Sequence, residues 1–535
     1  MFWRRSRRNP NCTGENVMDL PRNSPARARW HRYLRSVLPL AAPTLCVMLL
    51  GAIIFPALQG GLFPAYLRSS PASASGFERP DRNQPSSIHS ALPPPLGTVA
   101  FVDVNLVPMD REGVIPHQTV VVEGRRISAV GPATMQVPIQ SVRVEGYGRL
   151  YLMPGLSDMH SHASEESDFT LYVANGVTTI LTLGTPESFL ATRRKLNAGK
   201  MLGPTAYAAF FVDGDPPVDP SFFSVKGEDA ARSAVDRAKA EGYEFIKVYN
   251  NLGSTEFHAI LEEARRQRLA VVGHAVRSVE LKDAMNAGQV MVVHGEEYIY
   301  MYFHRSRDLA LVKQAVDFTR AAGAYVIPNL SAYEAISVQW GKPEQVEKFL
   351  SRPEASYLTP CRRRDWQHAD YVVRSGTLAG NLEFLRQFTK ALSDAGVPLA
   401  LGTDSPNIPG MFPGYSIHDD LRNMVQSGLT PYQALAAGTR VAGEFIKKYV
   451  PGAESFGTVQ VGNRADLLLL NRNPLDSVEN VREPVGVMAA GHWMPASFLH
   501  ERLDDFAKTF SSCSSALVPS PQSRLSICNK IACRR

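Results

Sequence analysis

The sequence is poor in cysteine and has no pair of cysteines spaced for a metal or redox motif. Its 535 residues include six cysteines: Cys12, Cys46, Cys361, Cys513, Cys528 and Cys533. Because no CxxC spacing occurs, the pattern indicates neither a zinc knuckle nor a disulfide framework. A single bridge between Cys528 and Cys533 remains an alternative if the chain is exported.

Excess positive charge is also missing outside the first 36 residues. The formal net charge is +6, but residues 1–36, a basic N-terminal tail, hold nine arginines against two acidic residues and account for +7. The remainder has 48 basic and 49 acidic residues, a net charge of −1. A nearly neutral body argues against a groove for nucleic acid, so we expect no nucleic-acid partner.

Charged residues are absent from residues 36–67, and this run contains an apolar segment, 37–58, long enough to span a bilayer. Four arginines between positions 27 and 35 precede it, so the positive-inside rule keeps the N-terminus cytoplasmic and exports the chain beyond the segment. The pattern predicts a signal anchor and a membrane-tethered body that is periplasmic or extracellular. A cleaved signal, with its site near residues 56–61, is the alternative. A core helix is disfavoured because the segment shows no amphipathic period.

A repeating pattern of strands and helices occupies the centre of the chain. Residues 69–96 are rich in Ser and Pro and predict a linker, and residues 97–150 contain short alternating strands separated by Gly and Pro. From residue 151 to 402, eight apolar runs of strand length alternate with helical patterns. Eight buried strands separated by helices predict a (β/α)8 TIM barrel, which we place at residues 151–445.

The regions around and after this barrel also carry expectations. Residues 446–500 contain three further strand patterns, at 456–462, 465–470 and 483–494, which we expect to join residues 97–150 in one composite β-sandwich domain. A long insert between the seventh and eighth strands, residues 334–378, is expected to form a lid over the barrel mouth. Residues 501–535 are Ser-rich without a clear period and predict a poorly ordered C-terminal extension.

Polar side chains recur in or at the ends of five of the predicted barrel strands. They are His160, His162, Lys247, His274, His294 and Asp404. The carboxyl ends of barrel strands meet at one mouth, and the two histidines of the first strand point the same way because they are two residues apart. Each residue alone has an ordinary explanation: a hydrogen-bonded core histidine, a strand cap or a lysine at the rim. Six coincidences at one mouth favour a metal site instead.

The lysine is the least ordinary member of this group. It lies in the apolar stretch "GYEFIKVYNN", residues 242–251, where an unpaired ammonium would be costly to bury. A lysine beside two metal ions can add carbon dioxide to become a carbamate, whose two oxygens bridge the ions and whose negative charge the ions neutralise. The alternative is a lysine whose ammonium reaches the rim of the barrel.

Five motifs together resemble the amidohydrolase superfamily, in its prolidase and imidazolonepropionase-related branch. They are "PGLSDMHSH", "FIKVY", "VVGHA", "VVHG" and "LGTDSP", in that family's order and approximate spacing. The later stretch "FGTVQVGNRADLLLLNRNPL" is similar to the one that completes the family's β-sandwich. The resemblance covers roughly residues 97–495 and implies a metal-dependent hydrolase on a (β/α)8 barrel.

The resemblance also implies roles for single residues. His160, His162 and Asp404 would hold one divalent ion, His274 and His294 the second, and carboxylated Lys247 would bridge them. Zinc fits the mixed donor set best, with manganese, cobalt or iron as alternatives, and carbon dioxide is required for the lysine. A metal-bridging hydroxide would attack, with Asp404 acting as general base and then acid. Tyr249 shares the face of Lys247 and either binds substrate or packs.

The expected reaction is cleavage of a C–N amide bond in a small molecule, such as an Xaa-Pro-type dipeptide or an N-acyl amino acid. Arg305 and Arg307, together with the aromatic residues of 296–307, would suit a substrate with an aromatic or acidic part. A lactonase or phosphotriesterase-like hydrolase on the same metals is one alternative. A non-catalytic scaffold is another, but it predicts broken ligand sets, and all six positions are filled here. The sequence sets no expectation for the oligomeric state.

Overall fold

The computed structural model describes residues 97–184, 187–220 and 222–515. The predictions for residues 1–36, 37–58 and 69–96 therefore lie outside the described residues. Within the described part, no helix combines the length and the apolar character that crossing a membrane requires.

A parallel β-barrel forms the larger part of the described chain. Its seven strands follow the sequence in order around the sheet: β6 (Leu156–Ser161), β7 (Val177–Leu183), β8 (Thr205–Gly214), β10 (Phe245–Val248), β11 (Ala270–Gly273), β12 (Gln289–Val293) and β13 (Tyr325–Ile327). The two-residue strand β9 (Ser224–Val225) pairs with β8.

The eighth position in the barrel is taken by residues 399–405, which form no regular strand. Parallel bridges join Val326 to Leu399 on one side and Ser161 to Ser405 on the other, so this segment closes the ring. Backbone hydrogen bonds of 2.8 Å from Met159 to Leu401 and of 2.7 Å from His162 to Ser405 support the closure. The predicted (β/α)8 barrel is confirmed.

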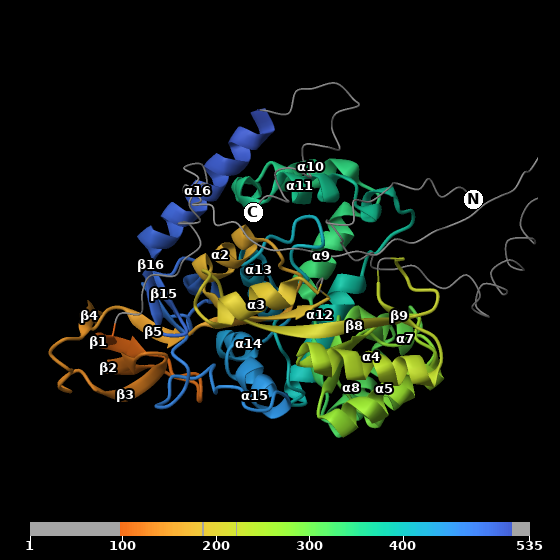
Figure 1. Cartoon of the computed structure of the whole chain (residues 1–535), viewed down its shortest axis with the longest axis horizontal. Helices are drawn as coiled ribbons and strands as arrows, with labels where there is room; N and C mark the ends of the chain where they lie inside the picture. Colours follow the sequence, from red (N-terminus) through yellow and green to blue (C-terminus); the bar gives the residue numbers. More distant parts are fainter. Residues whose placement is uncertain (1–96, 185–186, 221, 516–535) are drawn as a thin grey trace, which may run out of the picture. The chain divides into compact units, whose positions relative to one another are not determined.

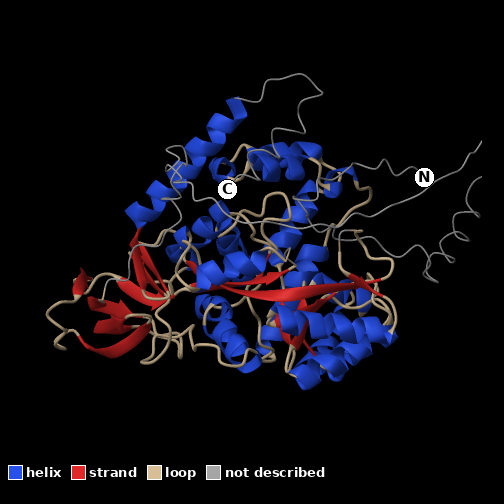
Figure 2. Cartoon of the chain, viewed as in Figure 1, coloured by secondary structure: helices blue, strands red, loops and turns tan. Residues whose placement is uncertain are grey.

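Helices cover the outside of the barrel (Figures 1 and 2). They are α2 (Glu166–Ala174), α3 (Phe189–Asn197), α4 (Glu228–Glu241), α5 (Ser254–Gln267), α6 (Leu281–Ala287), α7 (Glu296–Met301), α8 (Val312–Ala322), α9 (Leu330–Gln339), α12 (Asn381–Asp394) and α13 (Tyr415–Gln426). The sequence of α4 shows why they form. Its buried residues Ala231, Ala234, Val235 and Ala238 lie on one face at helical spacing. Two acidic residues occupy its first turn, and Gly242 ends it in the left-handed conformation.

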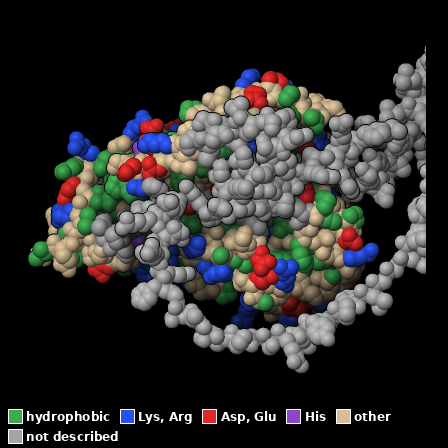
Figure 3. Space-filling view, turned by 45° about the horizontal axis from the view of Figure 1, so that its top comes forward, with side chains coloured by type: hydrophobic (Ala, Val, Ile, Leu, Met, Phe, Trp, Pro, Cys, Tyr) green, Lys and Arg blue, Asp and Glu red, His purple; other side chains and the backbone are tan. Residues whose placement is uncertain are grey.

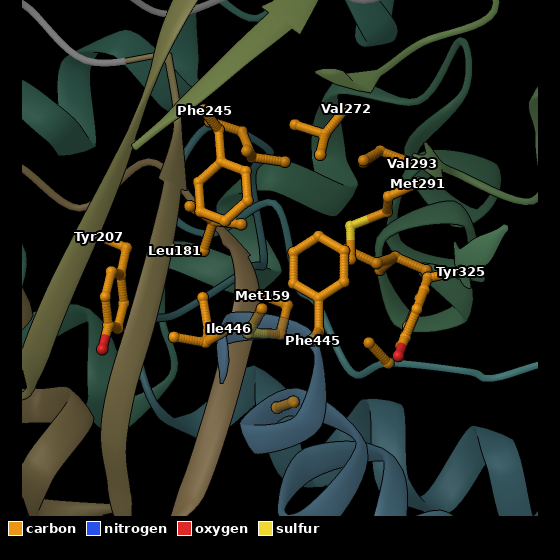
Figure 4. Packing of buried hydrophobic residues seen from close by; sticks show 14 of the residues in the cluster. Met159, Leu181, Tyr207, Phe245, Val272, Met291, Val293, Tyr325, Phe445 and Ile446 are labelled. Carbon is orange, nitrogen blue, oxygen red and sulfur yellow. The ribbon is translucent and has the colours of Figure 1, made fainter. Parts of the chain in front are cut away.

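The barrel interior is filled at its amino-terminal end by apolar side chains. Two helices follow the eighth segment, α14 (Pro431–Gly438) and α15 (Arg440–Tyr449). Phe445 and Ile446 of α15 point into the cluster formed by the strands (Figure 4), and Phe445 stacks on Phe245 with ring centroids 5.5 Å apart. Because apolar side chains fill this end of the barrel, the polar side chains of the strands lie at the carboxyl end.

Segments from before and after the barrel form a second sheet. Its strand order is β16-β15-β14-β5-β1-β2-β3, and β4 also pairs with β1. The strands are β1 (Thr98–Leu106), β2 (Ile115–Glu123), β3 (Arg126–Pro132), β4 (Val142–Glu145), β5 (Tyr151–Pro154), β14 (Leu467–Leu470), β15 (Gly486–Ala489) and β16 (His492–Pro495). The composite β domain is confirmed, because β14 from the end of the chain pairs with β5 from before the barrel.

Two sequence expectations for this domain are wrong in detail. The run 150–160 is not one strand: it is divided at Gly155 between β5 and β6, where a Cβ would come within 2.2 Å of the Thr178 hydroxyl. The pattern at 456–462 forms no strand, because Gly457 and Gly462 adopt positive φ angles. It lies along the sheet instead, where the amide of Val459 donates to the carbonyl of Pro108 at 3.0 Å.

The insert forms four short helices at the carboxyl end of the barrel. They are α10 (Pro343–Leu350), η3 (Pro353–Tyr357), α11 (Pro360–Gln367) and η4 (Asp370–Val373). Buried Trp366 of α11 donates its indole N–H to the carbonyl of Pro406 at 2.8 Å and packs edge-on against Phe412. The insert therefore packs directly on the chain that follows Asp404.

The structure also corrects the expectation that the chain is poorly ordered from residue 501. Residues 501–515 are helical and form most of helix α16 (Ala496–Ser515). This helix buries Leu499 and Leu503, and it lies against α2, η3 and α11. The burial of Leu499 and Leu503 explains why the first turns of this helix form. Residues 516–535 lie outside the described part.

Charge on the visible surface is mixed. Figure 3 shows Lys and Arg side chains interspersed with Asp and Glu over the described part of one face. Ion pairs between exposed or partly exposed side chains of the described residues include Arg237 with Glu241 and Lys390 with Asp394.

Candidate active site

Three of the predicted residues form a closed group at the mouth of the barrel. His160 lies in β6, His162 directly follows this strand, and Asp404 lies on the eighth segment next to it. The Nε2 atoms of the two histidines are 3.1 Å apart, and Asp404 Oδ1 lies 3.5 Å from the first and 3.0 Å from the second. Their potential ligand atoms all fall within 4.8 Å of one another, which is a spacing suited to one metal ion.

The two histidines of the later strands lie beside this group. The ring of His294 is 4.7 Å from that of His160 and 4.8 Å from that of His274, measured between centroids. His294 Nε2 is 3.9 Å from Asp404 Oδ2 and has no hydrogen-bond partner among the described residues. Among the described residues, His160, His162 and Asp404 are the group of His, Cys, Asp or Glu side chains whose ligand atoms lie close enough together to hold one metal ion. A second ion would need Lys247 as well.

Lys247 is fully buried in β10, as the sequence predicts. Its Nζ donates to the carbonyl of Leu183 at 2.9 Å and lies 5.1 Å and 5.4 Å above the rings of Phe211 and Tyr249. Tyr249, the predicted substrate-binding residue, is also buried, and its ring packs 4.1 Å from that of His274. The structure thus brings all seven predicted residues together. The described residues place neither Arg305 nor Arg307 among them: Arg305 lies over Tyr300, and Arg307 binds the carbonyl of Ala379.

Hydrogen bonds behind the histidines determine which ring nitrogen carries the proton. His160 Nδ1 faces Asn329 Oδ1 at 3.3 Å, His162 Nδ1 faces the carbonyl of Gly184 at 3.0 Å, and His274 Nδ1 faces Glu297 at 3.2 Å. Each partner is an oxygen that only accepts, so each Nδ1 must donate. The Nε2 lone pairs of these three rings are therefore directed away from these partners, as metal-ligating histidines require.

These supporting residues were not predicted from the sequence. Glu297 also forms a two-bond ion pair with Arg277, and Asn250 lies 3.2 Å from His274 Nδ1. Asp158 accepts from the amides of His160 and Thr403 at 3.0 and 3.1 Å and from the hydroxyl of Thr403 at 2.5 Å, so it ties β6 to the eighth segment. Two of these residues had a signal in the sequence, since Asp158 and Glu297 lie within three residues of His160 and His294.

The backbone at the ends of three barrel segments is left-handed. His294, Asn329 and Asp404 have φ angles of 73°, 50° and 60°. Residues other than glycine rarely adopt this conformation, and it is often retained where a function requires a particular side-chain direction. Here it turns the chain at the mouth of the barrel.

Burial sets the protonation states of the site. It lowers the pKa of His160 well below its usual value and lowers that of His294 to about 3, the latter also because His274 lies beside it. Burial alone would raise the pKa of Asp404, but the adjacent His160 and His162 outweigh it and the pKa is lowered. Neutral imidazoles beside an ionised carboxylate are the forms that bind a divalent cation.

A separate surface cavity of about 310 Å³ lies between α9 and residues 376–382, with Trp340 and Lys342 in its wall. None of the seven predicted residues lines it. The chemistry of the predicted group, rather than this cavity, identifies the candidate site.

Comparison with known proteins agrees with this fold and site. The profile of the amidohydrolase family matches residues 151–494. The chain therefore belongs to the amidohydrolase family, and it is a metal-dependent hydrolase that acts on carbon–nitrogen bonds. No curated protein matches the chain in sequence.

Solved structures with the same fold include three with informative names. A bottromycin amidohydrolase has a TM-score of 0.63 and 22% identity, with 80% of this chain and 94% of that chain covered. An Xaa-Pro dipeptidase with bound methionine has a TM-score of 0.56 and 19% identity, with 74% and 100% covered. A prolidase complexed with N-methylphosphonate-L-proline has a TM-score of 0.57 and 19% identity, with 74% and 99% covered.

Proposed function

We propose that this protein hydrolyses the amide bond of a small molecule at a two-metal site, with Xaa-Pro-type dipeptides and N-acyl amino acids as the candidate substrates. One observation carries the proposal. His160 and His162 direct the lone pairs of their Nε2 atoms toward each other across 3.1 Å, beside the Asp404 carboxylate. Such an electron-rich group is unfavourable unless a cation occupies it.

The donor set fits two divalent ions. His160, His162 and Asp404 would hold the first, and His274 and His294 the second, with Lys247 as a carboxylated bridge between them. The bare ammonium of Lys247 is buried with the carbonyl of Leu183 as a partner. Uptake of carbon dioxide would replace this buried cation by an anion that two metal charges neutralise. Zinc is the proposed metal, because imidazole and carboxylate together suit it.

Bound ions would supply an activated water and polarise the scissile carbonyl. The residues of the chain then have distinct tasks. Asp404 lies beside His160 and His162 and is held as a carboxylate, so it would take the proton of the attacking water and return it to the leaving nitrogen. The acceptors behind the histidines hold the rings in place throughout. The phenol of Tyr249, packed on His274, contacts the substrate beside the second ion.

The names of the structural neighbours support a substrate that contains an amino acid. Two of the three are a dipeptidase and a prolidase, and one of these carries a ligand built on L-proline. These proteins share the fold with this chain at 19% identity, so their names support the substrate class only as part of this proposal.

Metal content and hydrolysis test this function together. The full-length protein would be prepared with zinc and bicarbonate, as wild type and as Lys247→Ala, and assayed on Ala-Pro and on N-acetyl amino acids. We expect about two ions per chain and hydrolysis in the wild type, and loss of both in the variant. One ion or none in both proteins, with unchanged hydrolysis, would contradict the two-metal site. A Lys342→Ala variant, on the surface near α10, controls for removal of a lysine.

We further infer that residues 37–58 tether the protein to a membrane and that its body is exported. The apolar run and the four preceding arginines support this proposal. Cell fractionation of the full chain, beside a variant that begins at residue 69, tests it. Recovery of the full chain in the soluble fraction would contradict the tether.

A further inference from the structure

Two partly exposed phenylalanines lie beside the proposed bridging lysine. Phe211 belongs to β8, and Phe222 belongs to the segment that follows this strand. Their ring centroids are 4.6 Å apart, and they lie 4.9 and 5.7 Å from the ring of buried Tyr249. Lys247 Nζ lies 5.1 Å from the centre of the Phe211 ring. We call Phe211, Phe222 and Tyr249 the aromatic wall.

The register of the barrel shows that Phe211 points into its interior. Phe211 pairs with Lys247 in the parallel ladder between β8 and β10, and paired residues of neighbouring strands point to the same face of a sheet. Tyr207 and Ala209, which share this face of β8, lie in the apolar cluster inside the barrel (Figure 4). Because this cluster fills the amino-terminal end, the exposed part of the Phe211 ring faces the mouth.

Phe222 is held at the wall by the residues around it. The next residue, Phe223, packs against Phe210 on the outer face of β8, with ring centroids 5.0 Å apart. The amide of Asp213 donates to the carbonyl of Phe223 at 2.9 Å, and the buried Asp213 carboxylate accepts from the amide of Val218 at 2.7 Å. The chain is therefore fixed to β8 on both sides of Phe222.

The chemistry of the wall suits an apolar, planar group. Sites for small molecules are lined mainly by apolar and aromatic side chains, with a few polar groups that fix orientation. The three rings of the wall meet at interplanar angles of 46°, 50° and 81°, so a further ring can pack against them edge-on or offset. Phe211 and Phe222 have no polar side-chain atom, so a charged group placed against them would lose water without gaining a partner.

The order of the barrel strands indicates which part of a substrate meets the wall. β10 is the fourth strand of the barrel and the segment with Asp404 is the eighth, so the two face each other across the mouth. In the proposed reaction Asp404 returns a proton to the leaving nitrogen, which places the amine part of the substrate on its side. The acyl part, on the other side of the scissile carbonyl, then extends toward β8 and β10.

We propose that the aromatic wall binds an aromatic group on the acyl side of the scissile amide. The preferred substrates would then be dipeptides with an aromatic residue before proline, or amino acids with an aromatic N-acyl group. This inference rests on the proposed function and narrows its substrate class. It also assigns a role in specificity to Phe211 and Phe222, which the sequence did not single out.

Two pairs of dipeptides test the wall. Phe-Pro and Ala-Pro share the leaving proline and differ in the acyl side chain, whereas Ala-Phe and Ala-Ala share the acyl part and differ in the leaving amino acid. Values of kcat/KM would be measured with zinc-loaded full-length wild type, Phe222→Ala and Phe211→Leu, which keeps an apolar side chain inside the barrel. Phe506→Ala is the control, because it removes a partly exposed ring that stacks on Phe510 of α16. Zinc content and thermal unfolding would be measured on the same samples.

The expected result is a change in preference on the acyl side alone. Wild type should favour Phe-Pro over Ala-Pro by at least about 10-fold, and each wall variant should reduce this preference by at least about 5-fold. Phe506→Ala should keep the wild-type preference, and the ratio of Ala-Phe to Ala-Ala should be the same in all four proteins.

Three results would overturn the proposal. The first is equal use of Phe-Pro and Ala-Pro by wild type, which needs no variant to fold. The second is an unchanged preference in wall variants that keep their zinc and their unfolding temperature. The third is a change in the ratio of Ala-Phe to Ala-Ala in those variants, because it would place the wall on the amine side.

Calorimetric titration separates failure of the wall from failure of the proposed reaction. It would measure the binding of the four dipeptides to zinc-loaded wild type and Phe222→Ala. If wild type hydrolyses none of them but binds Phe-Pro more tightly than Ala-Pro, and Phe222→Ala loses that difference, the proposed reaction is wrong and the wall stands. If wild type hydrolyses Phe-Pro and Ala-Pro equally and binds them equally, the reaction stands and the wall is wrong.

Discussion

Asn329 holds His160 from behind, with its Oδ1 3.3 Å from His160 Nδ1. Its amide group also donates to the carbonyl of Gly402 at 2.7 Å, so one buried side chain connects the first metal-binding strand to the eighth segment. An oxygen acceptor at Nδ1 orients the ring and leaves Nε2 with its lone pair.

Replacing Asn329 should therefore weaken metal binding before it weakens the fold. We expect Asn329→Ala to lower the affinity for zinc about 10- to 100-fold, the range typical of such supporting residues. Competition with a chromogenic chelator measures this affinity. Asn473→Ala, which removes an asparagine from a surface turn with Asp476, is the control and should bind zinc as wild type does. Equal affinity in Asn329→Ala and wild type would show that Asn329 is only a packing residue.

Trp366 gives a second prediction, because it holds the chain just after Asp404. Trp366→Phe removes the 2.8 Å bond to Pro406 but keeps an aromatic ring against Phe412. We expect a fall in kcat of several-fold at nearly unchanged KM, with a loss of about 1 kcal/mol in the free energy of unfolding for the missing hydrogen bond. Trp340→Phe is the matched control, since Trp340 makes the same kind of bond to Ser375 at 3.1 Å, outside the site. A similar kcat in both variants would contradict a positioning role for Trp366.

Local patterns were enough to predict the barrel and its six polar residues. Apolar runs of strand length alternated with helices, and a histidine, lysine or aspartate stood in or after five of the strands. The residues that support the site could not be predicted in this way. Asn329 meets His160 across 169 positions, and Thr403 meets Asp158 across 245, so their roles depend on how the barrel closes.

Helix α16 and the irregular segment 456–462 show the same limit. Helix α16 forms because it buries Leu499 and Leu503 and packs against α2 and η3, and the residues 456–462 form no strand because two glycines turn the chain. Composition and period describe what a segment can do alone. Contacts made by distant parts of the chain decide between the alternatives.

His418 predicts a loss of stability in acid. It is fully buried on α13, and burial, with Arg482 nearby, lowers its pKa to about 3. The folded state keeps this ring neutral, whereas the unfolded chain binds a proton below its ordinary pKa near 6.5. The stability that this neutral histidine contributes is therefore fully present above about pH 6.5 and is lost as the pH falls toward 3.

The expected size of the effect is about 2 kcal/mol between pH 7.5 and pH 5 for this one histidine. Urea unfolding at both pH values measures it, in wild type and in His418→Gln, whose side chain cannot take up a proton. The difference between the two pH values should be smaller in the variant by that amount. If the two proteins lose the same stability, His418 is not the group that responds to pH.

Arg464 and Asp466 predict how firmly the β domain is attached to the barrel. Both side chains are buried, Arg464 Nε donates to Asp466 at 2.6 Å, and its Nη2 donates to Thr179 of β7 at the same distance. Removing one member of a buried ion pair leaves the other charge without a partner, so Arg464→Met should cost about 3–5 kcal/mol of unfolding free energy. Asp466→Asn in the same chain should restore part of this loss, because the amide is neutral yet keeps an oxygen for the backbone N–H of Ala490.

Urea unfolding of the single and double variants measures both effects. The zinc content of the folded protein should stay at the wild-type level, because none of the metal-binding residues contacts this pair. A double variant as unstable as the single one would mean that Arg464 acts through its packing on Phe456, 4.5 Å away, and not through the ion pair.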